Sequence, residues 1–408
     1  MWTNLKLNFK NVQIMRKLFI NRMLSESISE ALHYLPVVTL TGPRQSGKTT
    51  LCRKLFANLP YANLEDAAVM DEVLNDTKAF LNKYPNGVII DEAQNYPELF
   101  SYLQVQVDED RFQGHNDRHY IVTGSNNLSL IEKVSQSMAG RTAVMTLLPL
   151  STQEILSYAP QATTSQFILN GGYPAVWTAD NQARPLLLSN YYTTYVERDI
   201  RRLINVRDLH AFQTFIRMCA GRIGQEFNAS SMSGEIGVSI PTIKHWLSIL
   251  NASYIVHLLQ PYYANIGKRL TKTPKLYFYD TGLAAFLLGI TTTEQLDVHP
   301  LRGSLFENMV VNDFVKHGTN AGRDEMLSFY KDKSQHEVDI IRTSIDKMEA
   351  YEIKSAQTFH TDFFNNLNYI RTFLNDRLVR TTVIYDGNQE ASQTNNGFMN
   401  FRHLTFNN

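Results

Sequence analysis

Residues 42–49 combine a glycine-bearing turn with one lysine and one threonine, a set of residue types suited to holding phosphate. The stretch reads Gly42-Pro43-Arg44-Gln45-Ser46-Gly47-Lys48-Thr49 and is followed by Thr50. The glycines let the backbone curl so that successive N–H groups point at phosphate oxygens. Lys48 can reach the β- and γ-phosphates, and the Thr49 hydroxyl can coordinate Mg²⁺. The pattern predicts a nucleoside-triphosphate site, with residues 42–50 as its ligands.

Two adjacent acids follow a second apolar run. The segment Gly87-Val88-Ile89-Ile90 precedes Asp91 and Glu92, as expected for a buried parallel strand with carboxylates at its C-terminal end. Ligands of open α/β sheets bind at that end. We therefore expect Asp91 to hold Mg²⁺ and Glu92 to orient or deprotonate the attacking water. The alternative is that both acids cap the helix that follows.

Four further polar residues are candidates for contacting the γ-phosphate. Ser125 and Asn126 follow the apolar run 119–123, where a phosphate sensor would lie, although glycine, serine and asparagine also favour a turn there. Arg141 precedes another apolar run at 143–148 and can contact phosphate directly or across a subunit boundary, or face solvent. Arg198, in a mixed charge cluster at 197–202, is an arginine-finger candidate or part of a solvated face.

A second group with chemical potential lies near the C-terminus. Asp339 and the pair Glu352 and Lys354 lie on two expected strands, and positions 352 and 354 share one face because strand side chains alternate. Asp339 and Glu352 would then be carboxylate ligands for Mg²⁺, with Lys354 beside the attacking water. This set suits metal-assisted phosphodiester hydrolysis. Cross-strand ion pairs also produce the E-x-K pattern.

Alternating apolar runs and helical segments position the first site. Candidate strands at 37–40, 61–64, 87–91, 119–123 and 143–148 predict a parallel sheet covered on both faces by helices. Residues 151–225 are helical in pattern, with a sharp break at residues 171–174, Gly-Gly-Tyr-Pro. At the C-terminus, the patterns predict a helix, three strands, a helix over 362–378 and a strand over 381–385.

Residues 228–250 predict two short helices. Ser239 is the expected N-cap of the second, with Pro241 in its first turn. Its inward face would carry Ile243, Trp246 or Leu247, and Leu250, and its outward face Thr242, Lys244 and His245. With strands at 255–260 and 275–279, the segment resembles a winged-helix domain, which can place a helix in the DNA major groove. A structural or protein-docking role is the alternative, since Lys244 is the one firm cation on that face.

Composition limits the partners. Lys+Arg and Asp+Glu each number 39, so attraction to nucleic acid must come from local patches. The two cysteines form no metal or redox motif, no stretch reaches the length of a membrane span, and the N-terminus lacks a signal-peptide core. We expect a cytoplasmic protein without membrane association. Residues before about Met15 carry no periodic signal, and either Met1 or Met15 is the start.

A glutamate directly after the strand-ending aspartate resembles the AAA-type branch of P-loop ATPases. In that branch an extra strand separates the acidic strand from the phosphate-binding strand. The C-terminal pattern resembles the restriction-endonuclease-like, PD-(D/E)xK, superfamily, in which an extra acid on the first helix matches Glu307 and implies a further metal ligand. Val338 stands where that superfamily often has proline. From about Leu24 to Tyr385 the chain is similar to prokaryotic AAA-like ATPases fused to such a domain.

The expected fold class is α/β, with an N-terminal extension (1–24), an AAA-like P-loop ATPase domain (25–155), a helical segment (156–225), a winged-helix domain (226–290) and a restriction-endonuclease-like domain (300–408). We expect ATP and Mg²⁺ as ligands, Lys48, Glu92, Glu352 and Lys354 as catalytic residues, and action on or with DNA. A homo-oligomer or a protein partner is compatible with the sequence. The alternatives are a regulatory or scaffold ATPase that binds DNA or protein without cleaving it, and a chaperone-like remodeller.

Overall fold

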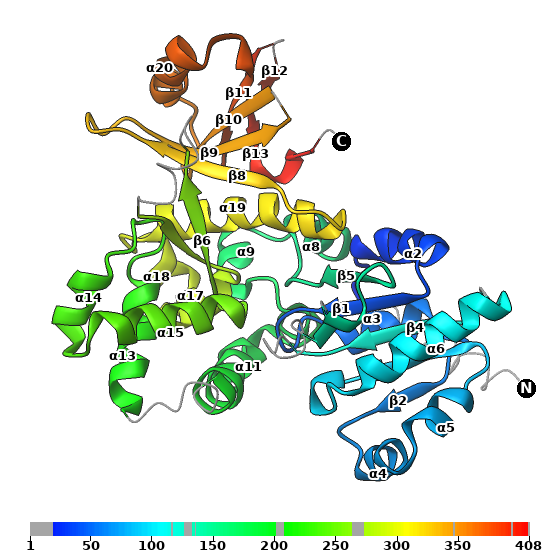
Figure 1. Cartoon of the computed structure of the whole chain (residues 1–408). Helices are drawn as coiled ribbons and strands as arrows, with labels where there is room; N and C mark the ends of the chain where they lie inside the picture. The colour runs from blue at the N-terminus through cyan, green and yellow to red at the C-terminus, as the bar shows by residue number, and fades with distance from the viewer. Residues whose placement is uncertain are drawn as a thin grey trace, which may run out of the picture.

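The chain is built around two β-sheets, with a largely helical part beside and between them (Figure 1). The computed structural model describes residues 19–115, 117–125, 133–134, 136–200, 208–262, 273–345, 347–392 and 395–406. Within these ranges no helix is both long and apolar enough to span a bilayer. In Figure 1 the first sheet lies at the lower right and the C-terminal sheet at the top.

The first sheet has five strands in the order β2-β3-β4-β1-β5, and all of its pairs are parallel. The strands are β1 (Val37–Thr41), β2 (Tyr61–Asn63), β3 (Gly87–Asp91), β4 (His119–Thr123) and β5 (Thr142–Thr146). The predicted parallel sheet is confirmed, with shifts of one or two residues at the ends of β1, β2 and β5. Strand β4 separates the acidic strand β3 from β1, as the AAA-type resemblance implies.

Helices cover both faces of this sheet, and its central strands β1, β3 and β4 are buried at every position except His119, which is partly buried. Val88 and Ile90 pack in one core cluster with α4 (Ala67–Asn75), α5 (Thr77–Asn82) and α6 (Leu99–Gln113). Ile89 points the other way, into a cluster with α2 (Leu24–Tyr34) and α3 (Lys48–Leu55). A strand buried on both faces is typical of parallel sheets.

The middle part begins with a series of short helices: α8 (Thr152–Tyr158), α9 (Thr164–Asn170), α10 (Pro174–Thr178), α11 (Arg184–Tyr191), the π-helical segment η3 (Tyr192–Ile200) and α13 (Leu209–Ala220). The predicted break after residue 170 is confirmed. Gly171 has φ +63°, and a Cβ there would lie 2.4 Å from the Asp280 carboxylate. Gly172 N donates to that carboxylate at 2.6 Å. Glycines are therefore required at this turn.

Helices α14 (Ala229–Ile236) and α15 (Ile240–Ala252) follow, and Ser239 caps α15 by accepting a 3.2 Å hydrogen bond from Thr242 N. Ile243, Trp246 and Leu250 are buried, whereas Lys244 and His245 are exposed, as predicted. Strands β6 (Val256–Pro261) and β7 (Lys275–Phe278) pair antiparallel. The connection at 263–272 lies outside the described residues.

The second sheet has mixed pairing and the strand order β12-β13-β11-β10-β9-β8-β6-β7. Its remaining strands are β8 (Met326–Lys331), β9 (Glu337–Ser344), β10 (Lys347–Lys354), β11 (Leu378–Tyr385), β12 (Ala391–Ser392) and β13 (Asn396–Asn400). The associated helices are α17 (Thr281–Leu287), α18 (Thr293–Asp297), α19 (Arg302–Asn320) and α20 (Asn365–Leu374). Helix α20 ends earlier than predicted because Asn375 adopts φ +48°. Helix α19 lies between the C-terminal sheet and the other parts (Figure 1).

Candidate functional site

The turn between β1 and α3 adopts a backbone that depends on its glycines. Gly42 and Gly47 have φ values of +135° and +95°, and Gln45 has φ +60°. A Cβ on Gly42 would lie 2.3 Å from the Leu147 carbonyl oxygen, so only glycine fits between the loop and the end of β5. Lys48 is the first residue of α3, as the sequence predicts.

Lys48 is buried and its ammonium group is bonded to its own loop. Nζ donates to the carbonyl oxygens of Gly42 at 3.0 Å and Pro43 at 2.8 Å. Burial lowers the pKa of Lys48 to about 8, although the nearby carboxylates of Glu92 and Asp91 favour the charged form. A phosphate oxygen is a stronger acceptor for an ammonium group than a neutral carbonyl. The side chain can therefore move from the loop to a bound phosphate.

Asp91, the last residue of β3, is bonded to the last residue of β4, the first residue of β2 and the first turn of α3. Its Oδ2 accepts hydrogen bonds from Thr49 Oγ1 at 2.7 Å and from the Tyr61 hydroxyl at 2.8 Å, while Oδ1 accepts a bond from the Thr123 hydroxyl. Thr49 and Asp91 thus meet, as expected. The sequence reasoning missed Tyr61 and Thr123, because neither belongs to a motif and each reaches Asp91 from a neighbouring strand.

A cavity of about 550 Å³ lies over the loop. The loop side contributes Arg44, Gln45, Ser46, Gly47, Lys48, Thr49 and Thr50, and Glu92 lines it as well. Glu92 has φ +57°, and Gln94 Nε2 donates to its carboxylate. Pro174, Ala175, Thr178, Thr194 and Tyr195 of the middle part complete the wall. The site is therefore shared between the sheet domain and the helices that follow it.

The other residues predicted to contact phosphate do not all lie at the cavity. Arg44 lines the cavity, with its guanidinium carbon 5.8 Å from the centre of the Tyr195 ring. Arg141 instead makes two 2.7 Å bonds to Asp108, and neither Arg141 nor the buried Ser125 is among the residues that line the cavity. Asn126 and the side chain of Arg198 lie outside the described residues. The structure brings Lys48, Thr49, Asp91 and Glu92 together, and does not bring Arg141 to them.

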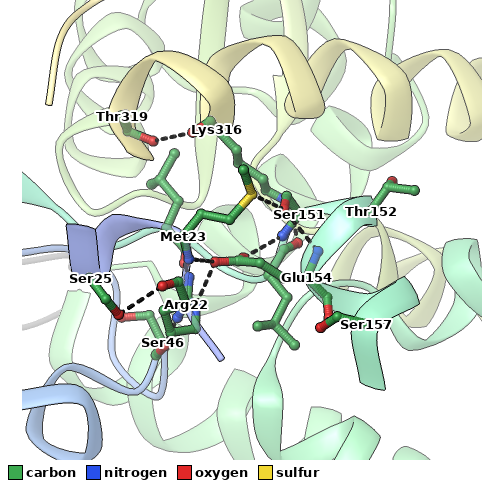
Figure 2. A network of polar contacts seen from close by, with 12 residues as sticks. Arg22, Met23, Ser25, Ser46, Ser151, Thr152, Glu154, Ser157, Lys316 and Thr319 are labelled. Carbon is green, nitrogen blue, oxygen red and sulfur yellow. Dashed lines mark hydrogen bonds and ion pairs between the residues drawn. The ribbon is translucent and has the colours of Figure 1, made fainter. Parts of the chain in front are cut away.

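Arg22 lines the cavity and supports the phosphate-binding loop. It is 6% exposed, and it donates from Nε to Glu154 Oε1 at 3.0 Å, from Nη1 to the Ser46 carbonyl at 2.7 Å and from Nη2 to the Leu148 carbonyl at 2.6 Å. Figure 2 shows Arg22, Ser46 and Glu154 converging at this point. Glu154 Oε2 also accepts a bond from Ser151 N at 2.9 Å, which caps α8. The phosphate-binding loop is thus tied to the first helix of the middle part.

The same helix is held from its other side by α19. Asp313 Oδ1 accepts a 2.9 Å bond from Thr152 N, and Lys316 Nζ donates to the Leu150 carbonyl at 2.8 Å. In Figure 2 Lys316 reaches down from α19 towards Ser151 and Glu154. Because α19 also carries Glu307, one helix contacts both the support of the nucleotide loop and the C-terminal carboxylates.

The C-terminal residues that the sequence singled out do lie close together. Asp339 Oδ2 accepts a 2.7 Å bond from Ile353 N on the adjacent strand, and Lys354 Nζ lies 2.6 Å from Glu352 Oε1. Glu352 is 4% exposed, and its Oε2 has no hydrogen-bond partner. Burial and the Asp339 carboxylate raise the pKa values of both Glu307 and Glu352. The cluster holds more carboxylates than its cations neutralise.

A lysine that sequence reasoning missed lies inside this cluster. Lys275 Nζ is 3.3 Å from Glu307 Oε1, 2.5 Å from Glu337 Oε1 and 3.8 Å from Asp339 Oδ1. The Tyr277 hydroxyl also donates to Glu307 Oε1 at 2.6 Å. Both residues come from β7, outside the E…D…E-x-K pattern, so no local signal marked them.

The Mg²⁺ site that the nuclease resemblance implies does not fit this arrangement. Across the described ranges, no group of three or more His, Cys, Asp or Glu side chains is placed to hold a metal ion. Oxygen ligands of Mg²⁺ lie about 2.0–2.1 Å from the ion. Here the oxygens of Glu307, Glu337 and Asp339 instead surround an ammonium group.

A larger cavity of about 1110 Å³ lies between α9 and the C-terminal sheet. Its two arginines, Arg302 and Arg402, share one carboxylate, Asp386, at 3.5 Å and 3.8 Å. None of the predicted site residues lines it. Size alone therefore does not identify it as the site of chemistry.

Three family models match the chain. Residues 35–156 match an AAA domain, residues 161–294 a domain of unknown function (DUF8612) and residues 302–404 another domain of unknown function (DUF4143). The first match agrees with the parallel sheet and the phosphate-binding loop, so the N-terminal domain has an AAA-like P-loop ATPase fold. The matches do not identify the C-terminal domain as restriction-endonuclease-like.

Whole-chain relatives are also found. Uncharacterized proteins of Mycobacterium tuberculosis and Mycobacterium bovis are each 30% identical over 363 residues, covering 88% of this chain and 78% of their own. An uncharacterized protein of Haemophilus influenzae is 22% identical over 375 residues, covering 82% of this chain and 86% of its own. Among solved structures, a Walker-type ATPase of Pyrococcus abyssi aligns with a TM-score of 0.46 and 14% identity over 66% of this chain and 96% of its own. The chain therefore belongs to the same protein family as the two mycobacterial proteins, with its AAA domain at residues 35–156.

Proposed function

We propose that the chain binds and hydrolyses ATP in the 550 Å³ cavity over the phosphate-binding loop. The observation that carries the proposal is the convergence of Lys48, Thr49, Asp91 and Glu92 at the loop. The apolar residues Phe19 and Ile20 line the same cavity and supply a surface for a nucleobase. The match of residues 35–156 to an AAA domain supports this assignment.

Each residue has a role in the proposed reaction. The loop amides bind the phosphates, and Lys48 leaves its carbonyl partners for the β- and γ-phosphates. Glu92, oriented by Gln94, accepts the proton of the water that attacks the γ-phosphorus atom. A hydroxyl and a carboxylate are ligands that Mg²⁺ accepts, so Thr49 and Asp91 fit the ion. When bound, Mg²⁺ neutralises charge on the β- and γ-phosphate oxygens.

For the C-terminal half we propose a binding role without cleavage, because Lys275 lies among the carboxylates that cleavage would require. The exposed residues Lys244 and His245 on α15 support DNA as the ligand, through the winged-helix resemblance. The buried, unpaired cysteines support a cytoplasmic location. Phosphodiester cleavage by Glu352 and Lys354 is the alternative that the sequence predicts for this domain. Assembly into a homo-oligomer stays a prediction from the sequence.

The test is steady-state ATP turnover of the wild-type chain and Lys48→Ala. We expect the variant to lose at least about 100-fold in rate, the loss typical for removing a group that stabilises transition-state charge. Lys78→Ala, a change at an exposed lysine of α5 that does not line the cavity, is the control and should keep the wild-type rate. Equal rates for wild type and Lys48→Ala would remove the ATPase assignment. Stimulation by duplex DNA would favour the DNA role, and stimulation by protein alone would favour chaperone-like remodelling.

A further inference from the structure

Lys275 is held rigidly where the carboxylates meet. It pairs with Leu259 of β6 and bridges to Glu226 on its other side. The flanking carbonyls are fixed as well, since Leu276 O accepts a 2.8 Å bond from Gly224 N and Pro274 O a 2.9 Å bond from Phe227 N. The side chain is 2% exposed. Its position is therefore set by the sheet and is not that of a solvated surface lysine.

The lysine is charged at this position. Its ammonium group lies 3.3 Å from Glu307 Oε1, 2.5 Å from Glu337 Oε1 and 3.8 Å from Asp339 Oδ1, and carboxylates at these distances favour the charged form. A buried ammonium group normally requires such partners. Lys275 therefore supplies the positive charge that a cluster of oxygen ligands would otherwise take from a metal ion.

The cluster contains a carboxylate oxygen that is still free to bind a cation. Glu352 is buried, its Oε2 has no hydrogen-bond partner, and its other oxygen is bonded to Lys354. An acceptor without a partner in the interior is costly. It lies in the same cluster as Asp339, whose proximity raises the pKa of Glu352.

We propose that the Lys275 ammonium is a built-in cation that occupies the divalent-metal position of the C-terminal carboxylate cluster. In the folded chain Glu307, Glu337 and Asp339 bind this ammonium and take up no divalent ion. Removing its charge while keeping the length of the side chain converts the cluster into a site for Mg²⁺ or Mn²⁺. The inference does not depend on ATP hydrolysis, because β7 and the cluster lie outside the nucleotide cavity.

The experiment titrates Mn²⁺ into the full-length chain without nucleotide and follows free Mn²⁺ by electron paramagnetic resonance. We expect Lys275→Met to gain one Mn²⁺ site that binds at least about tenfold more tightly than any site in the wild type, because a repelling ammonium is gone. Lys275→Arg keeps a cation in place and should gain no site. The double variant Lys275→Met/Asp339→Asn should lose the gained site. The nucleotide loop is intact in all of these chains. Any Mn²⁺ that binds there is therefore the same in every variant and does not affect the comparison.

Two results would overturn the inference. One is a Lys275→Met chain that has the wild-type circular dichroism spectrum and binds no more Mn²⁺ than the wild type. The other needs no change at Lys275: if Asp339→Asn lowers Mn²⁺ binding of the otherwise wild-type chain, a divalent ion already occupies the cluster. This comparison of Asp339→Asn with the wild type tests the inference even if Lys275→Met does not fold. DNA cleavage is not required as a readout.

Discussion

At the scale of single residues, the buried amine of Lys48 links ATP binding to pH. Its pKa in the nucleotide-free chain is about 8, below the ordinary 10.5, because of burial. Between these two pH values the unfolded chain binds more protons at Lys48 than the folded chain. The stability contribution of Lys48 therefore rises with pH across this window. Below about pH 8 the folded chain carries the full cost of the buried charge.

We predict that ATP binding takes up a proton at about pH 9 and almost none at about pH 6.5, because polyphosphate favours the charged form of Lys48. At the lower pH Lys48 is already protonated before ATP arrives. Calorimetric titration with ATP in buffers of different ionisation enthalpy measures the number of protons. Lys48→Met should abolish the uptake at the higher pH, and Lys78→Met, at an exposed lysine outside the cavity, should retain it. Uptake that persists in Lys48→Met would assign the proton to another group.

Site residues in contiguous motifs could be identified from the sequence, whereas site residues contributed by other strands could not. Lys48 and Thr49 are fixed by one turn, and Asp91 follows a recognisable buried strand, so their meeting could be predicted. Lys275 gave no such signal, because an isolated lysine in an apolar strand does not reveal which carboxylates it will face. Arg141 was a candidate from its position alone, and its 2.7 Å bonds to Asp108 depend on a helix-to-strand contact that periodicity does not encode.

At the scale of elements, the support between the nucleotide loop and α8 depends on one buried ion pair. Arg22 and Glu154 have side chains that are 4% and 1% exposed. Removing one partner of a buried pair typically costs about 3–5 kcal/mol. We predict a loss of this size in unfolding free energy for Arg22→Met, together with weaker ATP binding, because the Ser46 carbonyl loses its donor. Denaturant titration followed by tryptophan fluorescence measures the loss.

The exposed pair Lys83 and Glu72 serves as the matched control for that prediction. Its side chains are 54% and 42% exposed, so Lys83→Met should leave the denaturation midpoint unchanged. The double variant Arg22→Met/Glu154→Gln should cost less than the sum of the two single changes, since no buried charge is left alone. If Arg22→Met and Lys83→Met have equal midpoints, the buried pair contributes nothing to the support.

The sequence predicted the elements themselves better than their junctions. The five parallel strands and the order of C-terminal elements follow from hydrophobic periodicity, which is local. Residues before about Met15 carried no such pattern, and residues 1–24 were expected to be an N-terminal extension. In the structure Ile20 is buried in the main core and Arg22 holds the loop. The partner Glu154 lies 132 residues away, a separation over which pattern and spacing carry no information.

At the scale of the whole molecule, α19 joins the C-terminal sheet to the ATPase domain. Lys316 and Asp313 contact the start of α8, and Asn320 O accepts a 2.7 Å bond from Ser27 Oγ of α2. The nucleotide loop, α8, α19 and the carboxylate cluster thus form one continuous set of packed contacts. Through packed, polar junctions of this kind, a conformational change in one domain can alter the conformational equilibrium of another.

We predict that Lys316→Met separates the unfolding of the two halves. The variant leaves the Leu150 carbonyl without the Lys316 donor and removes a positive charge that stabilises the Asp313 carboxylate, which weakens the junction but neither core. Scanning calorimetry should then show two unfolding transitions. ATP should raise the midpoint temperature of only the transition that belongs to the ATPase domain, because a ligand stabilises the unit that binds it. Lys347→Met, an exposed change in the same C-terminal domain, should keep the wild-type profile. A Lys316→Met profile identical to wild type, with ATP shifting the whole of it equally, would mean that α19 does not couple the halves through this lysine.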